Sequence, residues 1–62
     1  MRAMIENLIN GNLTDARAQA KRYSWAAIRE ALQEHGHSLQ KAALGAKYLK
    51  TGQGWQAYCD EN

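Results

Sequence analysis

The chain consists largely of residue types that favour helices, and short polar breaks divide it into segments. Its 62 residues contain no Pro, Phe or Val, while Ala, Leu, Gln, Lys, Arg and Glu are frequent. These frequent types have high helix propensity, whereas a sheet would need more β-branched residues. The sequence therefore predicts an all-α fold: a compact bundle of four or five short helices in one small domain spanning residues 1–62.

The first predicted helix is short and has one apolar face. This face repeats at i, i+4 spacing and consists of Met4, Ile5, Leu8 and Ile9. Asn10-Gly11-Asn12 should end the helix, because Gly and Asn tolerate the left-handed conformation of a C-terminal cap. Asn12 or Thr14 can then cap a second helix that runs to about Tyr23.

Two apolar stripes with different directions predict a break at Ser24. The first stripe consists of Leu13, Ala16, Ala20 and Tyr23, and the second of Trp25, Ile28 and Leu32. On one straight helix the two stripes would point roughly 130° apart, and Ser24 is a good N-cap for a new helix. A continuous helix through Ser24 stays open as an alternative, because no strong breaker lies between Arg17 and Glu34.

The remaining helices have clearer boundaries. Gly36 should end the third helix, Ser38 should cap the fourth, and Gly52 should end it before a short last helix begins near Trp55. The fourth helix is rich in small residues, which let a neighbouring helix approach closely. We expect the core to contain Ile5, Leu8, Leu13, Trp25, Ile28, Leu32, Leu39, Ala43, Ala46, Leu49 and Trp55.

Basic residues gather in the middle of a chain whose net charge is +2. Arg17 and Lys21 stand one helical turn apart beside Arg22, and no acidic residue of the same helix lies at i±4 to neutralise either of the first two. These three are the candidate partner-binding residues. Glu30 and Glu34 form a like-charged pair on the next helix, so in an antiparallel packing the two pairs could simply face each other.

Residues 24–49 also resemble the DNA-binding end of Fis-type regulators. The resemblance rests on Ala-Ile-Arg-Glu-Ala-Leu at 27–32, on Gly36 and on Lys-Ala-Ala-Leu at 41–44. The resemblance implies a small helix-turn-helix-like protein that binds nucleic acid. In that alternative, Lys41, Lys47 and Lys50 join the three basic residues above as contacts. The chain departs from the family where a basic recognition helix should follow, because the helix after Gly52 is acidic and phosphates would repel it.

Catalytic, metal and membrane signatures are weak or absent. His35 and His37 flank a turn glycine, and neither they nor Cys59 stand in the spacing of a zinc site or a thiol enzyme. No apolar run approaches the roughly 20 residues of a membrane span. We therefore expect no enzymatic activity, no cofactor and no membrane partner, and a cytoplasmic location.

A broader similarity covers most of the chain. Segments 11–16, 20–23, 41–43, 48–50 and 55–59 resemble small, uncharacterised accessory proteins of bacterial plasmids and phages. The resemblance implies a mobile-element protein that binds another macromolecule, and it supplies no site residues. Together with the small core that a chain of this size can form, it favours a non-enzymatic protein-interaction module with an unidentified protein partner or with self-association.

Overall fold

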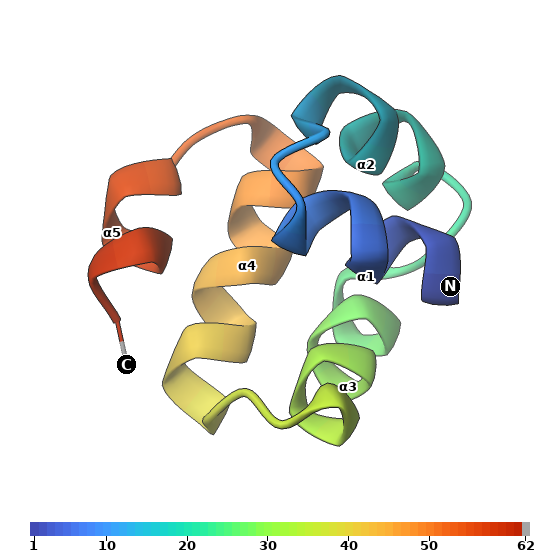
Figure 1. Ribbon diagram of the computed structural model, residues 1–62. Coiled ribbons are helices and arrows are strands. Elements are labelled where there is room, and N and C mark those ends of the chain that lie inside the picture. The colour runs from blue at the N-terminus through green and yellow to red at the C-terminus, as the bar shows by residue number, and fades with distance from the viewer. Residues whose placement is uncertain (62) are drawn as a thin grey trace.

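The computed structural model describes residues 1–61, which form five helices and no strand. The helices are α1 (Arg2–Ile9), α2 (Leu13–Ala20), α3 (Trp25–His35), α4 (Leu39–Thr51) and α5 (Trp55–Asp60). In Figure 1, α3 and α4 run in opposite directions, α1 and α2 lie together across one side of this pair, and α5 lies on the other side of α4. The prediction of an all-α bundle is confirmed.

The helix ends follow the predicted breaks. The hydroxyl of Ser24 accepts the backbone N–H of Ala27 at 3.1 Å, so α3 begins as a separate helix. The hydroxyl of Ser38 caps α4 in the same way, through the N–H of Lys41 at 3.1 Å. Gly36 and Gly52 end α3 and α4 with φ angles of 117° and 79°, in the left-handed region where a side chain would be strained.

The second helix ends earlier than the sequence predicted. It stops at Ala20 rather than near Tyr23, because the next amides donate to carbonyls three residues back instead of four. Such tightening is common in the last turn of a helix, where carbonyls lack regular partners. Lys21 nevertheless keeps helical angles, φ −62° and ψ −21°, so it remains about one turn from Arg17.

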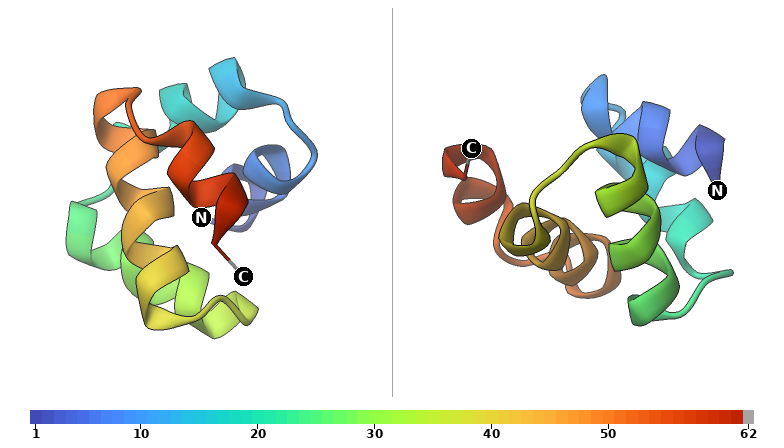
Figure 2. Two further views of the ribbon diagram at one scale, coloured as in Figure 1. Left: turned by 90° about the vertical axis from the view of Figure 1, so that its left-hand side faces the viewer. Right: turned by 90° about the horizontal axis from the view of Figure 1, so that it is seen from below.

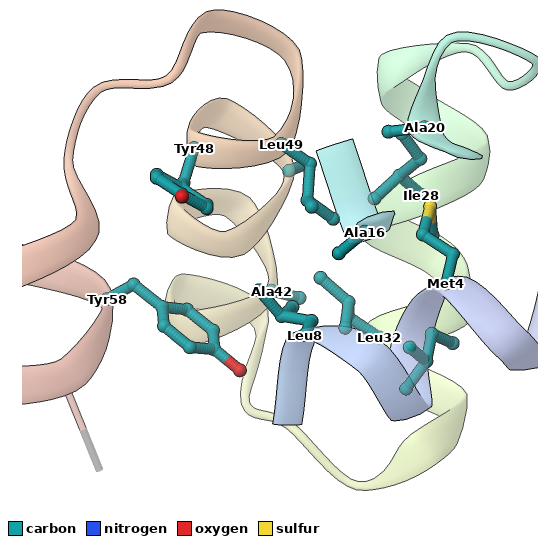
Figure 3. Close-up of a cluster of buried hydrophobic side chains, with 12 residues drawn as sticks. Met4, Leu8, Ala16, Ala20, Ile28, Leu32, Ala42, Tyr48, Leu49 and Tyr58 are labelled. Atoms are coloured by element: carbon teal, nitrogen blue, oxygen red, sulfur yellow. The ribbon is translucent and has the colours of Figure 1, made fainter. Parts of the chain in front are cut away.

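The core lies where α1 and α2 pack across α3 and α4. Figure 3 shows these side chains converging from all five helices, with Tyr58 reaching from α5 toward Ala42. The buried apolar residues are Met4, Ile5, Leu8, Ala16, Ala20, Ile28, Leu32, Ala42, Ala46, Tyr48, Leu49 and Tyr58. Small side chains supply a third of this set, so the helices approach closely instead of being separated by large side chains.

Two predicted core residues are wrong, and both occupy the first position of a helix. Trp25, which begins α3, is 43% exposed, and Leu39, which begins α4, is 64% exposed. Side chains on a helix tilt toward its N-terminus, so a first residue points past the packed part of its helix. Leu13 and Trp55 are partly buried against the core, and Ala43 is also only partly buried.

Small residues let α4 serve as the central helix. It packs against α2, α3 and α5, and at Gly45 the neighbours come especially close. A Cβ atom at this position would lie 2.7 Å from Cδ1 of Leu32 and 3.0 Å from Cε1 of Tyr58. The predicted close approach of a second helix is therefore confirmed, and both α3 and α5 come close to α4 at Gly45.

An aromatic cluster holds α5 against α4. The ring of Trp55 stacks on Tyr58 with a centroid distance of 5.4 Å and packs against Tyr48 at 5.0 Å. The left view of Figure 2 shows α5 lying beside α4. This contact helps to bury Tyr48 and Tyr58.

Candidate functional site

A groove runs between α2 and the C-terminal end of α4. It has a volume of about 370 Å³. Its lining combines apolar side chains with three cations and consists of Leu13, Thr14, Arg17, Ala18, Lys21, Tyr48, Leu49 and Lys50. We call this feature the basic groove.

The periodicity of α2 explains its contribution to the groove. Leu13, Arg17 and Lys21 succeed one another at intervals of one helical turn, and Ala18 and Thr14 fill the neighbouring row. Residues so spaced share one face of a helix. The two fully buried residues of α2, Ala16 and Ala20, lie on the adjoining face and hold the helix against the core, so Arg17 and Lys21 lie at the edge of the packed face.

Arg17 bridges the groove from α2 to the end of α4. Its guanidinium carbon lies 6.0 Å from the centre of the Tyr48 ring, at the outer limit of a cation–π contact. The same group fills the space beside Gly52, where a Cβ would lie 2.8 Å from the guanidinium carbon. Arg17 therefore sits at the C-terminal end of α4, where a positive charge is favourable.

Lys50 makes the reciprocal contact, from α4 to the end of α2. Its ammonium group donates to the carbonyl oxygen of Tyr23 at 2.8 Å and to that of Ala20 at 3.3 Å. Ala20 is the last residue of α2 and Tyr23 follows it, so neither carbonyl has a regular i+4 partner within the helix. The two helices thus exchange cations, each stabilising the end of the other.

The groove keeps a net positive charge after these contacts. A helix C-terminus carries a partial charge of about −0.5, so the ends of α2 and α4 together offset about one of the three cations. No acidic residue of the described chain lines the groove. Lys21 lies exposed at its edge without an ion-pair partner among residues 1–61.

The structure brings together only part of each predicted residue set. Arg17 and Lys21 share the groove, whereas Arg22 lines a separate small hollow of about 180 Å³ beside α1. Lys50, assigned to the nucleic-acid alternative, joins the first two. Thr14 could have been found from its i−3 spacing to Arg17, but the approach of Tyr48 and Lys50 depends on packing between distant helices.

The other two lysines of the nucleic-acid alternative lie elsewhere. The ammonium group of Lys41 donates to the carbonyl of Glu61 at 2.8 Å and lies 4.6 Å from the centre of the Tyr58 ring, so this residue faces α5. Lys47 is exposed on α4 and does not line the groove. Lys41 and Lys50 therefore contact different neighbours of α4, and the three lysines form no common stripe.

The acidic pair of α3 does not neutralise the basic pair of α2. Among residues 1–61 the ion pair formed is that of Arg2 with Glu6 at 3.3 Å. The main neighbours of α2 are α1 and α4, so α3 does not lie antiparallel against it. The antiparallel arrangement that would have paired these charges within one molecule is absent.

A second hollow, of about 580 Å³, lies between α1, α5 and the turn after α3. Here the Nε2 atom of His37 and the hydroxyl of Tyr58 are hydrogen bonded at 2.8 Å. Burial, with smaller contributions from Lys41 and His35, lowers the pKa of His37 below its usual 6.5. No group of three or more metal-ligating side chains forms in the described part of the chain, and Cys59 is exposed.

No family model matches the chain, and no curated protein or solved structure is significantly similar to it. None of the helices in residues 1–61 combines the length and apolar character needed to cross a bilayer. Any assignment of function therefore depends on the arrangement of the side chains themselves.

Proposed function

We propose that this protein is a non-enzymatic protein-interaction module that binds an acidic polypeptide segment in the basic groove. The observation that carries the proposal is the convergence of Arg17, Lys21 and Lys50 on one groove that contains no acidic side chain. A carboxylate entering this groove would gain charge-assisted hydrogen bonds, which are stronger than neutral ones.

The floor of the groove favours a polypeptide over a nucleic acid. Leu13, Ala18 and Leu49 line it together with the ring of Tyr48, and an apolar side chain next to a carboxylate would cover them. A phosphate backbone offers no such side chain. The packing of α4 against three other helices also argues against its insertion into a DNA groove.

A labelled helical peptide tests the proposal directly. Its exposed face would carry one leucine followed by two glutamates, each separated by one helical turn, and fluorescence anisotropy would report its binding. We expect the Arg17→Ala, Lys21→Ala double variant to bind the peptide at least about tenfold more weakly. Arg22→Ala serves as the matched control, because it removes a nearby cation that lies outside the groove.

The same titration with a labelled DNA duplex separates the two classes of partner. Phosphate contacts predict affinity that falls steeply with salt. The nucleic-acid alternative predicts tight, salt-sensitive DNA binding that is weakened by replacement of Lys41, Lys47 and Lys50. Such binding, together with no peptide binding, would replace our proposal with that alternative. The mobile-element origin and the cytoplasmic location stay predictions from the sequence.

A further inference from the structure

Two exposed stripes of this molecule are complementary in charge and spacing. The basic stripe is Leu13, Arg17 and Lys21 of α2, and the acidic stripe is Ala26, Glu30 and Glu34 of α3. In each stripe an apolar residue is followed by two like charges, one helical turn apart each time. All six side chains are exposed except that of Leu13, which is partly buried.

Neither stripe is neutralised within its own molecule. Arg17, Lys21, Glu30 and Glu34 have no ion-pair partner among the residues described. Like charges one turn apart on a helix repel each other, so each pair is destabilising by itself. A surface of opposite charge at the same spacing would relieve both repulsions.

We propose that the basic groove of one molecule binds α3 of a second copy. This inference rests on the proposed function and identifies the acidic segment as one that the chain itself carries. The acidic stripe offers two carboxylates at the spacing of Arg17 and Lys21, and Ala26 is small enough for the second helix to approach the groove closely.

The order of residues in the stripes selects a parallel docking of α3 along α2. In this register Ala26 covers Leu13, Glu30 meets Arg17, and Glu34 meets Lys21. The antiparallel register would exchange the charge pairs and leave Leu13 beyond the end of the acidic stripe. The apolar contact therefore distinguishes the two registers.

The positions of the stripes make the association head-to-tail. The groove opens between α2 and α4, whereas Glu34 lines a different hollow, between α1 and α3. Figures 1 and 2 show α2 and α3 in different parts of the molecule. Each copy can bind one neighbour through its groove and another through α3, which produces a ring or an open chain.

Sedimentation of two charge-reversed variants tests this inference. Lys21→Glu places a like charge opposite Glu34, and the Glu30→Lys, Glu34→Lys double variant places like charges opposite Arg17 and Lys21. The wild type should grow beyond a dimer as concentration rises, whereas each variant alone should sediment as a 7.0 kDa monomer. Mixing the variants should restore association, because each then offers the surface that the other lacks.

Controls separate docking from general effects of charge and folding. The Arg22→Glu, Lys47→Glu variant reverses two exposed cations outside both stripes and should associate like the wild type. Far-UV circular dichroism checks that each variant is folded. Raising the salt to about 1 M should dissociate the wild type, because exposed charges are then screened beyond about 3 Å.

Two reversals combined in one chain identify the register, because every groove then meets a changed α3. If α3 docks parallel, the Lys21→Glu, Glu34→Lys double variant should associate, since the two reversed positions face each other. The Lys21→Glu, Glu30→Lys double variant should stay monomeric, since like charges then meet at both positions. The opposite result would overturn the parallel register. If the wild-type protein remains monomeric but still binds the acidic peptide, self-association is refuted and the proposed function stands. If the wild-type protein neither associates nor binds the peptide, the inference and the proposed function are both refuted.

Discussion

The guanidinium of Arg17 shows how one side chain can serve both a fold and a binding surface. It fills the space beside Gly52 at the end of α4, and it also forms one wall of the basic groove. Gly52 has a φ of 79°, so the turn needs a residue that tolerates the left-handed region. The guanidinium of Arg17 also occupies the space that a Cβ at this position would fill. Two requirements therefore converge on this glycine.

Replacement of Gly52 by Ala separates these requirements. Gly11 has nearly the same φ, 81°, but has nothing within 4 Å of a Cβ, so Gly11→Ala reports backbone strain alone. We expect Gly11→Ala to cost about 1–2 kcal/mol of unfolding free energy. Gly52→Ala should cost about 1 kcal/mol more, because Arg17 is displaced. Urea denaturation measures both, and equal losses would contradict the placement of Arg17.

The imidazole of His37 makes stability depend on pH. The pKa of His37 is lowered in the folded state, first by burial and then by Lys41 and His35, so the unfolded chain binds the proton more readily. The contribution of His37 to the free energy of unfolding is fully present above about pH 6.5, and it is lost as the pH falls from there through the folded-state pKa. Urea denaturation at pH 8 and pH 5 should show this loss, and His37→Gln should reduce it. An unchanged pH dependence in that variant would assign the effect to other groups.

At the scale of the helix, lysine and arginine side chains complete the ends of neighbouring elements. Lys50 satisfies carbonyls after α2, Lys41 does so after α5, and Arg17 lies at the end of α4. These contacts join helices that are far apart in the sequence. Because these cations already interact with helix ends, the number of basic residues overstates the positive charge that is available to bind a partner.

Substitution of Lys50 tests its role at the end of α2, with Lys47 of the same helix as the control. Lys50→Met keeps the length of the aliphatic chain but removes both hydrogen bonds at the end of α2, and it should lower the unfolding free energy by about 1–2 kcal/mol. Lys47→Met removes an equal charge from an exposed position and should change stability by less than about 0.5 kcal/mol. Similar effects of the two substitutions would contradict the capping role.

The sequence predicted helix boundaries well because caps are local. Ser24, Ser38, Gly36 and Gly52 act within a few residues of their own position, and each ends or begins a helix as expected. The end of α2 was less predictable, because no capping glycine marks it. Burial of Trp25 was predicted wrongly because helical periodicity specifies a face of α3 but not where its neighbours end.

At the scale of the whole molecule, the sequence did not predict which helices pack against one another. Charge and spacing identified Arg17 and Lys21 as candidates, but the position of α4 decides that Lys50 joins them and that Arg22 does not. The same packing separates Lys41 from Lys50. Long-range arrangement of this kind depends on complementary surfaces, such as that of Gly45 with Leu32 and Tyr58, and these become visible only in the assembled core.

The unequal burial of the two tryptophans gives the molecule two distinct optical reporters. Trp25 is 43% exposed at the start of α3, next to Ala26 of the acidic stripe, whereas Trp55 is partly buried against the rings of Tyr48 and Tyr58. An aqueous quencher such as iodide should therefore quench Trp25 more strongly than Trp55. Intrinsic fluorescence can thus follow events at α3 and at α5 separately without an added dye.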